Sequence, residues 1–120
     1  MPRIVTNAYV DAVYFMPFTA DKSEGVFAKP GTRTMYNDCR REAALEAGAD
    51  MDLAESLAAL KILQKCITNW KGFYNTEGDE IPYRPEVLKD LWENDTAMFS
   101  SIFVRHREIA RMGELADEKN

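Results

Sequence analysis

At 120 residues the chain has the length of one domain, which can bury a hydrophobic core but leaves little room for a second. Hydrophobic residues make up 46% of the sequence and charged residues 29%, a balance typical of a globular protein and not of a disordered one. The net charge of −5, from 20 acidic and 15 basic residues, argues against a nucleic-acid partner, which requires a clustered positive surface.

The longest apolar run, residues 10–18, is interrupted by Asp11 and is far too short to cross a membrane. The N-terminus lacks the charged and then apolar pattern of a signal peptide. We therefore expect no membrane partner and a cytoplasmic location.

The first part of the chain favours β-structure. Residues 8–18 are rich in β-branched and aromatic side chains and predict a strand. Turn-forming residues follow at 19–25, and residues 26–28 offer a short partner strand before Pro30-Gly31 breaks the chain. Residues 1–31 are therefore predicted to form a strand or hairpin arm.

Two helices are predicted next. The first covers residues 34–47, with Gly48 where the glycine that ends a helix belongs. The second begins at Asp50 or Asp52 and is predicted to continue to Trp70, because apolar residues recur at steps of three and four. Its two apolar rows are Leu53, Leu57, Leu60, Leu63, Ile67 and Trp70, and Ala54, Ala58, Ile62 and Cys66. A stripe of this width predicts a central helix with neighbours on two sides.

Two more helices are predicted in the C-terminal third. Pro85 suits the first turn of a short helix over residues 85–93. Asp95 or Thr96 would cap a last helix, whose outward side includes Arg105 and whose inward side carries Phe99, Ile102, Phe103, His106, Ile109 and Ala110.

Together these elements predict a mainly α fold, a compact helical domain of about four helices with a short N-terminal β-hairpin. The whole chain, residues 1–120, is predicted to be a single domain. Its helical body spans residues 32–115, and the small and charged residues 116–120 are expected to fray.

No residue pattern points to catalysis. His106 is the only histidine and lies on an apolar face without metal ligands at neighbouring turns, so we expect a buried structural side chain. Cys39 and Cys66 stand alone within predicted helices and are expected to be buried free thiols. Single scattered glycines form no phosphate-binding loop. We therefore expect no enzymatic activity, no catalytic residue, no metal and no cofactor.

The most distinctive segment is residues 67–91. An apolar helix closing at Trp70 leads into Gly72, an acidic turn with the sequence Glu-Gly-Asp-Glu-Ile-Pro-Tyr, and a helix beginning near Pro85. This layout resembles the tail assembly chaperones of long-tailed bacteriophages, where a Trp closes the central helix and an Asp/Glu-Gly-x-x-Ile/Val-Pro-Phe/Tyr turn precedes an amphipathic helix. The positions that match one by one, which we interpret as determinants of the fold, are Trp70, Gly72, Gly78, Pro82 and Tyr83.

The resemblance implies a non-enzymatic protein that binds and solubilises the tape measure protein during tail assembly. It would act in the cytoplasm of the infected bacterium and be absent from the mature virion. Members of the family often have a longer product, made by ribosomal frameshifting, that recruits the tail tube protein. Such a chaperone would cover the apolar faces of client helices. Phe73, Tyr74 and Trp92 crowd around the turn and are the candidate client-binding residues.

Three alternatives stay open at this point. The chain fits a structural tail-completion or head–tail connector protein retained in the virion, a helical adaptor unrelated to phages or, least well, an enzyme. Self-association is a further expectation, since a protein that shields apolar client helices can shield its own surface by pairing.

Overall fold

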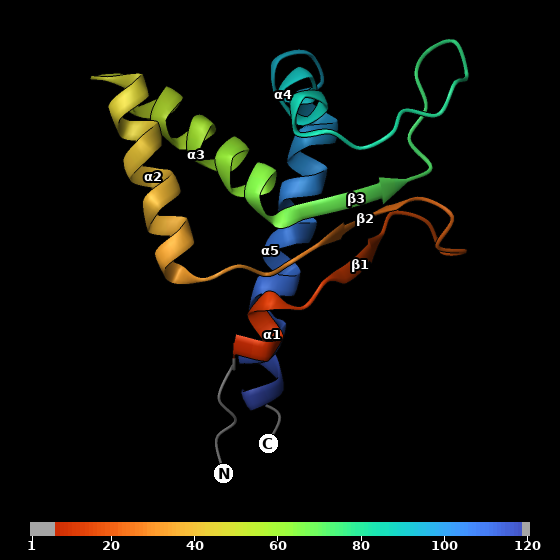
Figure 1. The fold of residues 1–120 in the computed structure, drawn as a ribbon, viewed down its shortest axis with the longest axis horizontal. Helices are drawn as coiled ribbons and strands as arrows, with labels where there is room; N and C mark the ends of the chain where they lie inside the picture. The colour runs from red at the N-terminus through yellow and green to blue at the C-terminus, as the bar shows by residue number, and fades with distance from the viewer. Residues whose placement is uncertain (1–6, 119–120) are drawn as a thin grey trace.

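The computed structural model describes the backbone of residues 7–118 and the side chains of residues 9–110. Over residues 7–118 its elements are five helices and three strands (Figure 1). In chain order they are α1 Asn7–Asp11, β1 Tyr14–Pro17, β2 Gly25–Ala28, α2 Arg33–Ala47, α3 Met51–Cys66, β3 Ile67–Lys71, α4 Pro85–Asn94 and α5 Thr96–Glu118. The prediction of a mainly α fold is therefore confirmed in outline.

The predicted arm and tail extend past the described part of the chain at both ends. Residues 1–6 of the arm and residues 119–120 of the tail lie outside it. The remaining tail residues, 116–118, form the last turn of α5.

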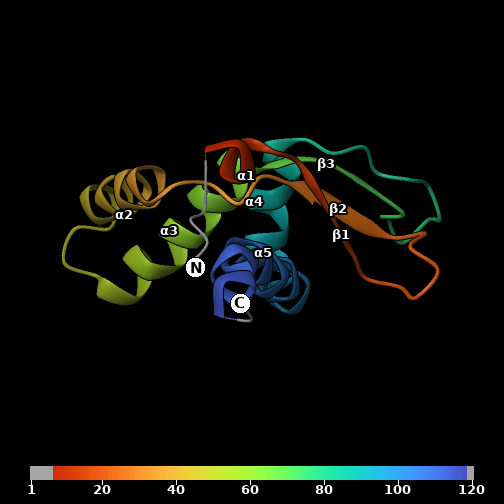
Figure 2. The same cartoon turned by 90° about the horizontal axis from the view of Figure 1, so that it is seen from below.

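The three strands form one antiparallel sheet in the order β1-β2-β3. Met16 of β1 pairs with Val26 of β2, which pairs in turn with Trp70 of β3, and all three side chains are buried. They belong to the same core cluster as Ile102 of α5. The sheet and α5 therefore form two layers, while α2 and α3 extend to one side of them (Figure 2).

The strand predicted over residues 8–18 is confirmed only for β1, and its first part is wrong because that part forms α1. Tyr9 accounts for the difference. Its hydroxyl donates a hydrogen bond to the backbone carbonyl of Ile109 on α5, and its ring lies 5.1 Å from the ring of Tyr14. Contacts that are distant in the sequence therefore outweigh the β propensity of this segment.

The helix predicted to continue to Trp70 ends at Cys66 instead. The residues that follow it form β3, which pairs with the free edge of β2, so the predicted hairpin is part of a three-stranded sheet. The spacing of Ile67 and Trp70 led to the wrong prediction. Both side chains are buried although they are three residues apart, a spacing that fits one face of a helix and not one face of a regular strand.

A β-bulge in β3 explains how this strand buries two residues three apart. Ala28 pairs with Ile67, but the preceding residue of β2, Phe27, pairs with Asn69. Thr68 is therefore an extra residue on β3, and its hydroxyl donates a hydrogen bond to the carbonyl of Phe27 at 3.3 Å. An inserted residue shifts the alternation of buried and exposed side chains by one position. Trp70, two residues after Thr68, therefore points to the same buried face as Ile67.

α3 is the central helix, as predicted, because its buried residues divide between two clusters. Leu63 belongs to the larger cluster, together with residues of the sheet, α4 and α5. Ile62 and Cys66 meet Cys39 of α2 in a smaller cluster. Leu53, a member of the predicted apolar row, is 37% exposed, because the buried residues that α3 contributes to the larger cluster, Leu60 and Leu63, lie further along the helix.

The predicted helix ends are largely confirmed. The carboxylate of Asp50 accepts a hydrogen bond from the N–H of Leu53 at 3.0 Å, and that of Asp95 accepts one from Met98 at 3.2 Å. These bonds satisfy N–H groups that have no partner within the helix. Gly48 follows α2 with a positive φ of 64°, which glycine adopts without a steric penalty, and its N–H donates a hydrogen bond to the carbonyl of Ala44 at 3.1 Å.

Two glycines of the loop between β3 and α4 have a positive φ, 80° at Gly72 and 88° at Gly78. They differ in their surroundings. A Cβ at Gly72 would lie 2.8 Å from the backbone carbonyl oxygen of Ser23, whereas a Cβ at Gly78 would meet nothing within 4 Å. Gly72 therefore holds β3 close to the β1–β2 loop.

We predict that Gly72→Ala lowers the free energy of unfolding by about 3 kcal/mol, because it adds a backbone clash to an unfavourable φ. The matched variant Gly78→Ala is expected to lose only about 1 kcal/mol, since there only the φ is unfavourable. Urea denaturation of the two variants measures the difference. Equal losses would contradict the close approach at Gly72.

Candidate functional site

The three candidate client-binding residues do not form one surface. Phe73 stacks on Trp70, with 4.5 Å between ring centroids, and meets Phe18 edge-on at 5.7 Å. Trp92 donates a hydrogen bond from its indole N–H to the hydroxyl of Ser56 at 2.6 Å, which connects α4 to α3. Only Tyr74 is clearly exposed, at 60%.

Of the turn residues that match the phage family, Tyr83 contacts Trp70. The indole N–H of Trp70 donates a hydrogen bond to the carbonyl of Ile81 at 2.8 Å, and the ring of Tyr83 lies edge-on at 5.1 Å. The tip of the turn is closed by Asn75, whose side-chain oxygen accepts bonds from the N–H groups of Glu77 and Asp79. These contacts fit our interpretation of the turn as a determinant of the fold.

The contacts of Phe73 and Trp92 predict effects on stability. Phe73→Ala should lower the free energy of unfolding by about 2 kcal/mol, and Trp92→Phe by about 1 kcal/mol through the lost hydrogen bond. Tyr74→Ala should change it by less than about 0.5 kcal/mol, because the side chain is exposed. Thermal unfolding of the three variants gives the ranking, and a Tyr74→Ala loss as large as that of Phe73→Ala would contradict it.

His106 is buried on α5, as predicted. Its Nε2 lies 2.8 Å from the backbone carbonyl oxygen of Lys29, so this nitrogen carries the proton and donates it. The ring of Tyr36 meets the imidazole edge-on at 6.4 Å. Burial lowers the pKa of His106 below its usual value, and the hydrogen bond to Lys29 offsets part of that effect. The imidazole is therefore neutral near pH 7 and connects α5 to the segment after β2.

We predict that stability decreases as the pH falls below about 6.5, the ordinary pKa of histidine. In that range the unfolded chain binds a proton that the folded His106 resists, whereas above it both states are neutral. Urea denaturation at pH 7.5 and 5.5 should show the loss in the wild type and a smaller one in His106→Gln. An equal loss in both proteins would contradict the assignment to His106.

The two cysteines are buried and unpaired, as predicted. Burial raises the pKa of both thiols, that of Cys66 to about 12. The thiolate is the nucleophilic form, so neither side chain is set up for catalysis. Among the described side chains, no group of three or more His, Cys, Asp or Glu residues could hold a metal ion.

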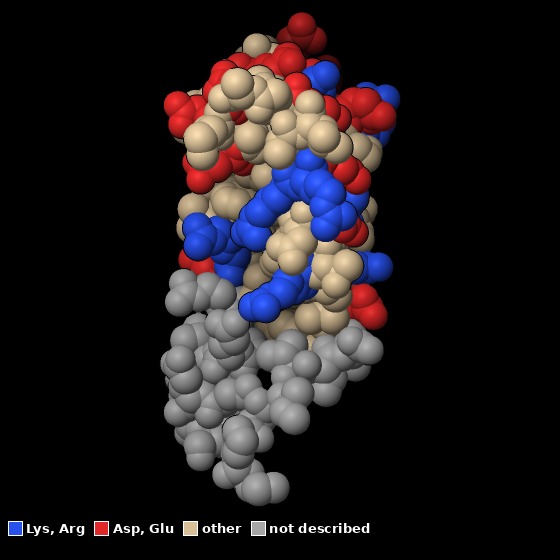
Figure 3. All heavy atoms as spheres, turned by 90° about the vertical axis from the view of Figure 1, so that its left-hand side faces the viewer, with Lys and Arg blue, Asp and Glu red and all other residues tan. Residues whose placement is uncertain are grey.

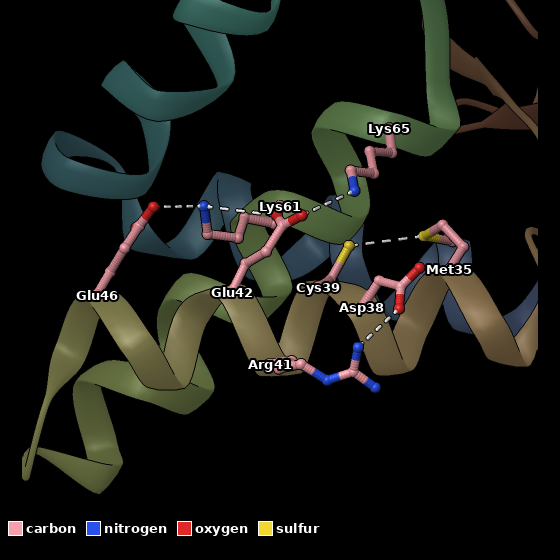
Figure 4. Close-up of polar contacts among 8 residues, drawn as sticks. All are labelled: Met35, Asp38, Cys39, Arg41, Glu42, Glu46, Lys61 and Lys65. Carbon is pink, nitrogen blue, oxygen red and sulfur yellow. Dashed lines mark hydrogen bonds and ion pairs between the residues drawn. The ribbon is translucent and has the colours of Figure 1, made fainter.

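Ion pairs fix α2 against α3 along one edge. Lys61 of α3 lies between two carboxylates of α2, with its Nζ 2.9 Å from Glu46 and 4.0 Å from Glu42 (Figure 4). Lys65 lies 3.6 Å from Glu42. Each exposed pair contributes at most about 1 kcal/mol, with most of the attachment coming from the buried cysteine cluster.

A groove of about 1060 Å³ lies between α2, α3 and α5 and is open to solvent. Its lining is largely apolar, and much of it is made of small side chains. Ala54 and Ala58 of α3 line it together with Phe103 and Ala110 of α5. His106 also borders the groove, so its contact with Lys29 fixes the α5 wall.

Two arginines border this groove, Arg40 on α2 and Arg107 on α5. No carboxylate among the described residues forms an ion pair with either of them. On the face of the molecule that carries α2, basic side chains gather across the middle and acidic ones around the upper end (Figure 3). The acidic groups of the groove itself are Asp52 and Glu55, near the α2–α3 turn.

The groove was not foreseen as a site. The row of Ala54 and Ala58 was assigned to packing between helices, although small residues also leave room for a helix from another protein. The sequence holds no signal for the position of the α5 wall, because that depends on how α5 packs against the sheet.

Comparisons with known proteins identify no relative. No family model, no curated protein and no solved structure matches this chain. Within the described residues, no helix is long and apolar enough to span a membrane.

Proposed function

We propose that the chain is a non-enzymatic tail assembly chaperone of a long-tailed bacteriophage, which binds the tape measure protein and keeps it soluble until the tail is built. It would act in the cytoplasm of the bacterial host and be absent from the finished virion. Any longer frameshifted product would add contact with the tail tube protein.

The observation that carries this proposal is the open groove between α2, α3 and α5. A chaperone for a long helical client needs a surface that receives apolar helix faces, and grooves between helices are one common way to do so. The resemblance over residues 67–91 supports the proposal through the turn residues Gly78, Pro82 and Tyr83. Its first element differs from the family pattern, because Trp70 lies on β3 and not at the end of a helix.

Co-expression tests the proposed function. The chain should be produced together with the long tape measure candidate from its own genome, and the soluble fraction compared with that of the candidate expressed alone. We expect the candidate to become soluble and to co-purify with the chain. A candidate that stays insoluble, with no complex formed, would contradict the proposal.

Mass spectrometry of purified virions separates the chaperone from a structural tail protein. The chain should be missing from virions while present in infected cells, since a chaperone leaves before the tail is complete. Its recovery from virions in a fixed ratio to the tail proteins would favour a tail-completion or connector protein instead.

A further inference from the structure

From the shape and charge of the groove between α2, α3 and α5, we infer that it is the client-binding site and that its occupant is an amphipathic helix of the client with acidic residues beside its apolar stripe. This inference rests on the proposed function. It adds where on the chain the client binds, which kind of client segment binds there and what charge that segment carries.

The lining of the groove suits a helix. Ala44, Ala54 and Ala110 come from its three different helices, and side chains of this size let another backbone approach closely. The exposed Met51 borders the groove, with a flexible thioether that adapts to apolar surfaces of different shape. Phe103 supplies a large apolar contact. An amphipathic helix presents apolar side chains on one stripe, which matches a groove of this kind.

The charges around the groove define the occupant further. On α2 and α3, Arg41, Lys61 and Lys65 are each within 4.0 Å of a carboxylate of the chain itself. Arg40 and Arg107 have no such partner among the described residues, and they come from different helices of the groove. Asp52 and Glu55, which line the groove near the α2–α3 turn, have no ion pair among the described residues either. Guanidinium groups pair well with carboxylates, so acidic residues beside the apolar stripe of the occupant would pair with Arg40 and Arg107. Asp52 and Glu55 would instead face basic residues at the end of the occupant near the α2–α3 turn.

A second copy of the chain is a poorer occupant than a client helix. Of the large apolar side chains that the described residues leave exposed, Val13, Leu45, Tyr74 and Val104 lie singly on separate segments, and Met51 and Leu53 share only the first turn of α3. The apolar stripes of α4 and α5 are already used, since Leu88 and Ile102 are fully buried. Over the described side chains, residues 9–110, no helix therefore offers a free apolar stripe to the groove of a neighbouring copy.

Two sets of variants test the groove with the client co-expressed. Ala54→Trp fills it, and the double variant Arg40→Glu with Arg107→Glu reverses its charge. The matched controls are Ala97→Trp, an exposed position on α5 that does not line the groove, and Arg41→Glu with Lys89→Glu, which changes the net charge equally at exposed positions. Circular dichroism confirms that each protein folds before the co-purified client is measured.

Both groove variants should reduce the co-purified client at least tenfold, and both controls should retain it. If the wild type and all variants bind the client equally, the groove assignment is wrong and the proposed function stands. If the wild type binds no client, the proposed function fails and the groove assignment fails with it. If light scattering shows that Ala54→Trp converts a dimer into a monomer, the occupant is a second copy and the inference is overturned.

Discussion

The two-sided packing of α3 is the constraint on which the rest of the structure depends. One side of this helix contributes Leu60 and Leu63 to the core that holds the sheet, α4 and α5, and the other contributes Ile62 and Cys66 to the contact with α2. Because α2 and α5 pack on different sides of α3, they do not close over its small residues. α2 and α5 meet through Tyr36 and His106, whose rings lie 6.4 Å apart, and the groove opens beside this contact over the small residues of α3.

The residues that stand out in the sequence and the residues that line the groove are different sets. Phe73 and Tyr83 both pack against Trp70 and fix the loop between β3 and α4. Large aromatic side chains bury much area per residue, and in a small domain much of that area is needed for the core. The groove is instead lined by alanines and bordered by Arg40 and Arg107. A binding surface made of such residues has little signature in a single sequence.

Local patterns in the sequence were enough to predict the elements they control. Asp50, Gly48 and Pro85 marked helix ends correctly, because capping depends on neighbours within one turn. Long-range contacts decided what the sequence could not show. The spacing of Ile67 and Trp70 is compatible with a helix or with a bulged strand, and only the free edge of β2 selects the strand. The groove could not be predicted from the sequence either, since its walls come from helices far apart in the chain.

The most direct test of the account is site-specific photo-crosslinking in the complex with the tape measure candidate. A photoreactive amino acid would replace Ala54 in the groove or Tyr74 at the exposed turn, in otherwise identical full-length chains. We expect a crosslink from position 54 to an amphipathic, acidic segment of the client, and little from position 74. A crosslink that forms from position 74 alone would contradict the groove assignment and would place the client at the turn between β3 and α4.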